Sequence, residues 1–383
     1  MAQSTEVAII GGGVIGCSIA YELSKRDIEC TLFERSKLAS GASGVTAGII
    51  GPLWYLNPKD VPTFRLGRQS LAMFPPLVAT LINTGTTPSF FNHGILRIAI
   101  THTELMALKE RFTWLNKFNC QLEWLNNTEL LNLEPGLNPN VIAGVYSPTE
   151  GSVHGKNYIG ALSHAAKTFG AKFLEDTEVL GLETIAHTVI GVRTKNNTCH
   201  AGHTVLAAGP WTGINQKWAH DRFPIRPVKG QRIALKKKGF KPSLTISRTG
   251  GSIIPQNNDT ILVSGTREEG LFNFDVTENG VKKMWTSAIE AFPDLKDAKF
   301  MGALAGVRPG SPDDTPIMGP VPGLNRLIIA SGHDHSGIML SPGSSKLIAD
   351  YIETGDSSEL SPFNIQRFDN EPPIHKTRCS DTD

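Results

Sequence analysis

The spacing of apolar and polar residues along the chain predicts alternating strands and helices. An apolar run at 7–10, a helical stretch and a second apolar run at 30–33 together predict a βαβ unit at the start of the chain. Segment 102–118 carries Leu105, Leu108, Phe112 and Leu115 at helical spacing, which predicts an amphipathic helix.

The same criteria predict the remaining elements. Further helices are expected at 62–82, 127–132, 156–169, 277–291 and 338–354. Further strands are expected at 95–100, 171–174, 177–183, 189–194, 203–207, 231–235, 252–255, 260–264 and 327–330. Because residues 225–310 read mostly as strands, we expect a β-rich domain inserted into one α/β domain that three separated segments assemble.

The turn after the first strand carries the clearest chemical signal. It reads Gly11-Gly12-Gly13-Val14-Ile15-Gly16, and Glu34 ends the second strand. In dinucleotide-binding folds such glycines allow a tight turn, close approach of the backbone to a pyrophosphate and close helix packing, while the acid binds ribose. The helix N-terminus offers free N–H groups to the phosphates. This segment therefore predicts a nucleotide cofactor.

Composition narrows the class of protein. The chain has 383 residues, 40% of them hydrophobic and 19% charged, with a net charge of +1 that gives no reason to expect nucleic-acid binding. Its five cysteines lack C-x-x-C spacing, which favours reduced thiols over disulfides or a metal site. No apolar stretch approaches about 18 residues. We therefore expect a cytoplasmic protein without a signal peptide, membrane span or metal.

Further motifs follow in a characteristic order: 42–49 (Ala-Ser-Gly-Val-Thr-Ala-Gly-Ile), 228–231 (Val-Lys-Gly-Gln), 306–310 (Gly-Val-Arg-Pro-Gly) and the Gly-His to Gly-Ile segment at 332–338. With the N-terminal glycine turn, they make the chain resemble the D-amino-acid oxidase-like family of FAD-dependent amine oxidoreductases. The resemblance is greatest to its glycine oxidase and sarcosine oxidase branches.

The resemblance implies FAD in a discontinuous Rossmann-like domain of segments 1–85, 145–222 and 300–368. The substrate domain, 86–144 and 223–299, is expected to be built on a mostly antiparallel sheet, and 369–383 to be a polar tail. Glycine-rich turns at 41–51, 207–210 and 332–337 agree with a large flavin enclosed along its length. Non-covalent binding is expected, because no Cys or His lies within 40–52.

The resemblance also places individual residues at the cofactor. Together these residues are expected to surround the whole cofactor, from its adenosine to its flavin ring. In chain order they are Gly11, Gly13, Val14, Ile15, Gly16, Glu34, Arg35, Ala42, Ser43, Ala47, Gly48, Ile49, Val179, Ala208, Gly209, His333, Asp334, His335, Ser336, Gly337, Ile338 and Met339. The helix that starts after this last turn would direct its N-terminus at flavin N1/O2, where negative charge develops on reduction.

Arg308 is the strongest candidate for substrate recognition. It lies between a strand and a Pro-Gly turn, and its guanidinium could bind a carboxylate with two parallel hydrogen bonds. The alternative is a structural arginine paired with Asp313 or Asp314.

Two positions depart from the glycine oxidase pattern that the resemblance suggests. His335 stands nearest the place of a second arginine, and Ser252 stands where an aromatic hydroxyl is expected. We therefore predict Arg308, His335 and Ser252 as the catalytic set, and a bulkier or N-substituted amine is an alternative to glycine. His333 and His335 flank Asp334 but lack further ligands at defined spacing, so no metal is expected.

The implied reaction is oxidative deamination of a small amino acid of the glycine, sarcosine or D-amino acid type. Hydride transfer from Cα to flavin N5 would give a 2-oxo acid, ammonia or an amine, and hydrogen peroxide. The alternatives are a dehydrogenase subunit for an opine, proline or hydroxyproline, a flavin-holding scaffold subunit, and an NAD-binding dehydrogenase. The expected partners are the amino acid or amine and either oxygen or an electron-accepting protein, and a homo-oligomer is compatible with the sequence.

Overall fold

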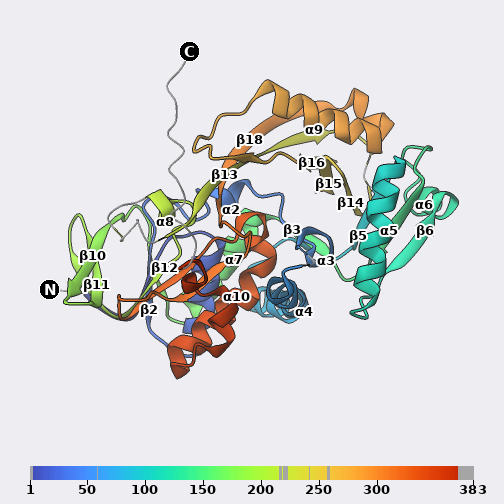
Figure 1. Ribbon diagram of the computed structural model, residues 1–383. Coiled ribbons are helices and arrows are strands. Elements are labelled where there is room, and N and C mark those ends of the chain that lie inside the picture. The colour runs from blue at the N-terminus through green and yellow to red at the C-terminus, as the bar shows by residue number, and fades with distance from the viewer. Residues whose placement is uncertain are drawn as a thin grey trace, which may run out of the picture.

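The computed structural model describes residues 3–57, 59–214, 218, 223–240, 242–256 and 259–369. The predicted polar tail lies outside the described residues from residue 370 onward. Two large sheets and a small one make up the β-structure. Figure 1 shows the first large sheet around β2 and β12, and the second running from β13 and β18 towards β5.

The first sheet has eight strands with a parallel centre. Strands β9, β2, β1, β12 and β20 pair in parallel, whereas β10, β11 and β19 pair antiparallel at the margins. Their bounds are β1 (Gln3–Ile10), β2 (Cys30–Phe33), β9 (Lys172–Leu174), β10 (Val179–Ile185), β11 (Thr188–Thr194), β12 (Thr198–Leu206), β19 (Ile317–Pro320) and β20 (Leu327–Ser331). The strand predicted at 203–207 starts earlier because its first residues pair with β11 and β1.

Four helices cover this sheet. They are α1 (Val14–Ser24), α4 (Val61–Asn83), α7 (Gly155–Thr168) and α10 (Gly337–Thr354). Helix α1 packs against α7 and α10, and α10 packs against α4 (Figure 1). Ten of the eleven residues of α1 are buried, because the helix has packed neighbours on nearly every side.

The second sheet has nine strands and is antiparallel except where β5 meets β14. The strands are β5 (Ile95–Ala99), β6 (Glu123–Asn126), β7 (Ala143–Ser147), β13 (Arg226–Lys236), β14 (Thr245–Arg248), β15 (Gly251–Pro255), β16 (Thr260–Ser264), β17 (Glu268–Glu269) and β18 (Lys299–Gly310). Helix α9 (Glu278–Ala291) packs on β13, β15 and β16, and α5 (His102–Asn116) and α6 (Asn127–Leu133) pack on β5, β6 and β7. The prediction of a mixed fold with a mostly antiparallel second sheet is confirmed.

Short elements join the two large sheets. A small sheet contains β3 (Ile49–Ile50), β4 (Phe90–Phe91) and β8 (Gly151–Val153). The short helices are α2 (Ala42–Val45), α3 (Pro52–Tyr55), α8 (Trp211–Ile214) and the 3-10 turns η3 (Pro293–Asp297), η4 (Asp334–Ser336), η5 (Ser358–Phe363) and η6 (Ile365–Phe368).

Strand β18 bears on the division into domains. It pairs with β13 from Arg226↔Gly310 to Lys236↔Lys299, so the boundary predicted at residue 299 falls at the start of a strand of the second sheet. The division into two domains stays a proposal, and this pairing favours a boundary after residue 310.

Candidate active site

A cavity of about 470 Å³ lies at the carboxyl ends of β1, β2, β12 and β20, where the second sheet faces them. This is the edge at which parallel α/β sheets bind ligands, and the volume is in the range of small-molecule sites. Every residue predicted at the cofactor or in the catalytic set lines it, except Gly16 and Ser336.

The glycine turn after β1 has the backbone geometry that the motif requires. Gly11 has φ +113°, and a Cβ there would lie 2.5 Å from the carbonyl oxygen of Ala207. A Cβ on Gly16 would lie 2.0 Å from the carbonyl oxygen of Gly11, so this glycine permits the turn without lining the cavity. Glu34 accepts hydrogen bonds from the backbone N–H of Gly12 at 2.7 Å and of Ser36 at 2.9 Å, which fixes its carboxylate beside the turn.

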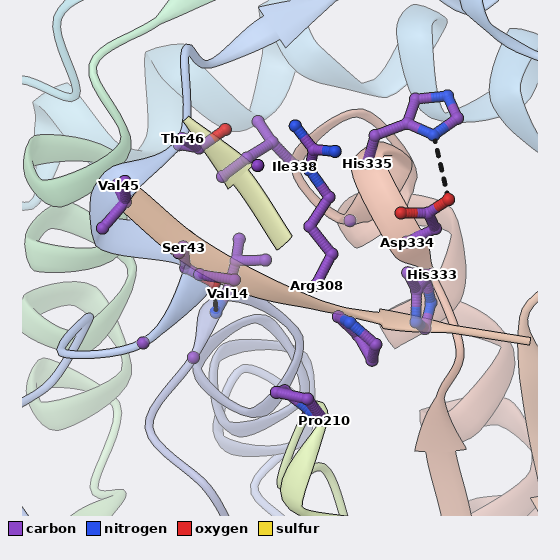
Figure 2. Close-up of a pocket in the computed structure, with 18 of the residues that line it drawn as sticks. Val14, Ser43, Val45, Thr46, Pro210, Arg308, His333, Asp334, His335 and Ile338 are labelled. Atoms are coloured by element: carbon purple, nitrogen blue, oxygen red, sulfur yellow. Dashed lines mark hydrogen bonds and ion pairs between the residues drawn. The ribbon is translucent and has the colours of Figure 1, made fainter. Parts of the chain in front are cut away.

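Two helix N-termini meet the cavity. No side chain caps α1 at Gly13, and the N–H of Val14 donates to Ser43 Oγ at 3.1 Å (Figure 2). Helix α10 also begins without a side-chain cap, and its first residues line the cavity. Free N–H groups and positive helix ends favour anionic groups. These features fit the phosphates and the electron-rich pyrimidine edge of a flavin dinucleotide.

Arg308 projects from β18 into this cavity without an acidic partner. A Cβ on Gly230 would lie 2.2 Å from its Nη2, so the guanidinium rests directly over that glycine of the neighbouring strand. Its Nη1 donates to the Thr266 carbonyl at 3.3 Å, and burial lowers its pKa. Figure 2 shows Arg308 beside Ile338.

The alternative pairing of Arg308 is not seen. Asp313 pairs with Arg367 at 2.8 Å, and Asp314 pairs with Arg267 at 3.1 Å. Within the described residues Arg308 therefore forms no ion pair. A buried guanidinium of this kind favours an anionic ligand.

The turn at the start of α10 contains two histidines with different surroundings. His333 is buried, with Nε2 3.0 Å from Ser344 Oγ, and burial lowers its pKa to about 3. His335 is partly exposed, with Nε2 2.9 Å from the Tyr55 carbonyl and Nδ1 3.5 Å from Asp334 Oδ2 (Figure 2). Both ring nitrogens of His335 therefore face oxygen acceptors, one from α3 and one from the same turn.

Asp334 connects this turn to the second sheet. Burial raises the pKa of its carboxyl, but the contacts with His335 and Arg267 outweigh burial and hold that pKa well below its usual range. The carboxylate is nearly inaccessible and pairs with Arg267. Asp334 is thus negatively charged at neutral pH, and its charge is used in the contacts with Arg267 and His335.

Tyr55 is a site residue that the sequence did not indicate. Its hydroxyl lies 2.6 Å from Ser252 Oγ and 2.7 Å from Ser247 Oγ, and Tyr55 lines the cavity. Ser252 still stands where an aromatic hydroxyl was expected, but α3 supplies a phenol to the cavity from almost 200 residues away in the sequence. The only signal was its position just after the small-residue segment 41–51, which the resemblance set against the flavin ring.

Further arginines line the cavity and were also missed. Arg248 pairs with Glu104 at 3.1 Å and with Glu290, and Arg267 pairs with Asp334. Arg35, which was predicted, stacks on the Trp211 ring at 4.0 Å. Arg232 lines the cavity as well.

The described part of the chain offers neither a metal-binding cluster nor a membrane-spanning helix. No group of three or more His, Cys, Asp or Glu side chains there could hold a metal ion. No helix among these residues is long and apolar enough to cross a membrane.

Comparison with known proteins finds relatives over nearly the whole chain. The model of the FAD dependent oxidoreductase family matches residues 6–351. A glycine oxidase of Geobacillus kaustophilus is 30% identical over 371 residues, covering 96% of this chain and 98% of that protein. A glycine oxidase of Pseudomonas aeruginosa is 31% identical over 355 residues, covering 91% and 95%. The crystal structure of glycine oxidase from Geobacillus kaustophilus matches with a TM-score of 0.90 at 30% identity, covering 96% and 99%.

Proposed function

The chain belongs to the FAD-dependent oxidoreductase family, and on that premise we propose that it oxidises a small amino acid with oxygen as electron acceptor. The amino acid, oxygen and water would yield a 2-oxo acid, ammonia and hydrogen peroxide. The observation that carries the substrate class is Arg308, a buried guanidinium without an acidic partner in the same cavity as the dinucleotide turn.

Different residues of the cavity would bind the cofactor and the substrate. FAD, when bound, would supply the redox chemistry, that is, the acceptor for a hydride from the substrate Cα. The glycine turn and the N-terminus of α1 would hold the pyrophosphate of FAD, and Glu34 would hold its ribose. Arg308 would hold the substrate carboxylate with two charge-assisted hydrogen bonds, and this fixes the orientation of Cα. Tyr55 and Ser252 offer further hydroxyls in the same cavity for the amine or its substituent.

The comparisons do not favour the alternatives. Full-length relatives at about 30% identity bear the name glycine oxidase, which argues against a dehydrogenase subunit or a scaffold without turnover. The match to an FAD family likewise argues against an NAD enzyme.

An amino acid panel tests the proposal directly. We expect purified holoenzyme to lose its flavin absorbance near about 450 nm under anaerobic conditions with glycine, sarcosine or a D-amino acid, and to form hydrogen peroxide in air. Bleaching without peroxide would contradict the role of oxygen. Absence of bleaching with every amino acid and amine would contradict the proposed function.

Substitution of Arg308 tests the carboxylate anchor. Arg308→Ala should raise KM for carboxylate substrates about 10- to 100-fold, because a charge-assisted hydrogen-bonded pair is lost from a buried site. Arg308→Lys, which keeps the charge without the bidentate geometry, should give an intermediate KM. Flavin content, read from the absorbance ratio, should stay unchanged in both variants. An unchanged KM in Arg308→Ala would remove the assigned role.

A further inference from the structure

A row of polar side chains crosses five strands of the second sheet and forms one wall of the cavity. Strand pairing places its members directly opposite one another on one face: Arg97, Ser247, Ser252, Ser264 and Arg232. The phenol of Tyr55 and Nη1 of Arg97 both bond to Ser247 Oγ, each at 2.7 Å. At the other end of the row, Ser252, Ser264 and Arg232 line the cavity.

Arg232 is the member of this row that has no partner. Within the described residues it makes no side-chain hydrogen bond or ion pair, and its Nε is buried without a hydrogen-bond partner. Burial alone lowers the pKa of its guanidinium, whereas nearby carboxylates help to raise that of Arg267. A partly desolvated cation without a counter-charge is costly to maintain, so its presence calls for a ligand.

The other arginines that line the cavity differ from Arg232. Arg248 and Arg267 pair with carboxylates, and Arg35 stacks on Trp211. Only Arg308 and Arg232, among the described arginines of the cavity, lack both kinds of partner.

These two arginines lie on the same face of paired strands. Arg308 faces Val228 on β13, and its guanidinium reaches over Gly230. Arg232 is two residues farther along β13, so its Cα is displaced by roughly 7 Å from that of Gly230 on the same face. Because both side chains also line the main cavity, one short molecule can contact both guanidiniums.

Space for a second substrate group adjoins Arg232. A hollow of about 250 Å³ next to the main cavity shares Arg232 with it, and its lining includes His154, Asn157 and Gln256. Arg232 thus stands at the boundary of the two spaces.

We propose that Arg232 binds a second carboxylate of the substrate, so that the preferred substrate is an amino acid with two carboxylates, one held by Arg308 and the other by Arg232. The proposal rests on the proposed function, because Arg308 must hold the first carboxylate. The second carboxylate could be carried on the side chain, as in aspartate and glutamate, or on the nitrogen, as in N-carboxymethyl glycine. The anchoring chemistry is the same in both cases.

Binding of simple acids to the holoenzyme tests the anchor without turnover. Glutarate should bind at least 10-fold more tightly than butyrate by isothermal titration calorimetry, since only glutarate can reach both guanidiniums. Arg232→Gln should reduce this preference to below about threefold, and Arg232→Lys should restore part of it. The control Arg193→Gln makes the same chemical change at an exposed arginine paired with Glu183 on β10, and should keep the preference. Equal binding of the two acids to the unsubstituted protein would overturn the proposal.

Turnover identifies where the second carboxylate is attached. The dicarboxylates to be compared are glutamate and aspartate, each in D and L form, and N-carboxymethyl glycine. We expect kcat/KM for at least one of them to exceed that for alanine and sarcosine at least 10-fold. Arg232→Gln should abolish this difference. Preference for the monocarboxylates would overturn the dicarboxylate proposal while leaving amino acid oxidation intact. Absence of oxidation of any amino acid, with glutarate still bound through Arg232, would instead overturn the proposed function and retain the anion site.

Discussion

His333 and His335 lie two positions apart in one turn, yet the structure gives them different chemistry. His333 is enclosed beside Ser344, and burial keeps it neutral at physiological pH. His335 is held between the Tyr55 carbonyl and Asp334 at the wall of the cavity. The same residue type therefore serves packing in one position and site architecture in the other, a difference that depends on contacts made by distant residues.

The burial of His333 predicts how stability depends on pH. Below its usual pKa of about 6.5 the unfolded chain gains a proton at this histidine, whereas the folded chain does so only near pH 3. The free energy of unfolding should therefore fall as pH drops from 6.5 towards 3, by at most about 1.4 kcal/mol per pH unit from this group. His333→Gln should flatten that slope in urea titrations between pH 7 and 5.

The matched control for this prediction is His200→Gln, at an exposed position on β12. It should leave the slope unchanged. Equal slopes in the unsubstituted protein and His333→Gln would contradict the assignment.

At the scale of elements, the turn between β1 and α1 is specified largely by residues close to it in the sequence. Its glycines are required by contacts within the βαβ unit and with the end of β12, such as that of Gly16 with the Gly11 carbonyl. Because most of these contacts span few residues, the motif predicted the turn correctly. The polar row of the second sheet is the opposite case, since its members meet only through strand pairing.

Two glycine substitutions, one at a buried and one at an exposed helix position, test this point. Gly16→Ala in α1 should lower the free energy of unfolding by about 3 kcal/mol and reduce flavin retention, because a Cβ would meet backbone at 2.0 Å. Gly160→Ala in α7 is the control, since a Cβ there has nothing within 4 Å. It should stabilise the protein by up to about 1 kcal/mol through helix propensity. Similar effects of the two changes on thermal unfolding would refute the steric account.

At the scale of the whole molecule, the site exists where two sheets meet. The first sheet supplies the dinucleotide turn and the start of α10, and the second supplies Arg308, Ser252 and Arg232. The ion pair between Arg267, beyond β16, and Asp334, beyond β20, ties the two together beside the cavity. This contact therefore helps to fix the substrate wall relative to the cofactor edge, together with the contacts of β18 with α2 and η4.

Asp334→Asn tests the contact with little change in shape. Asn tolerates the positive φ of +43° at this position, so the substitution removes charge without adding backbone strain. We expect the free energy of unfolding to fall by about 1–3 kcal/mol, the range for hydrogen bonds to charged groups. In a double-mutant cycle, Arg267→Gln should cost less in the Asp334→Asn background than alone. Strict additivity of the two changes would show that the pair is not coupled.

The sequence alone determined the features that arise from neighbouring residues. The βαβ unit, its glycine turn, Glu34 and the Arg308 segment are all short motifs, and local backbone sterics and hydrogen bonding are enough to specify them. Their order along the chain was also sufficient to indicate the family and FAD.

Only the tertiary structure decided which polar groups are paired. Tyr55 reaches Ser252 through packing of α3 against the second sheet, and Arg308 is left without Asp313 or Asp314 because other arginines bind those acids. Among the described arginines of the cavity, Arg232 shares with Arg308 the absence of both an ion pair and a ring contact. Whether a charge is neutralised depends on everything that surrounds it in space, and no local pattern in the chain carries that information.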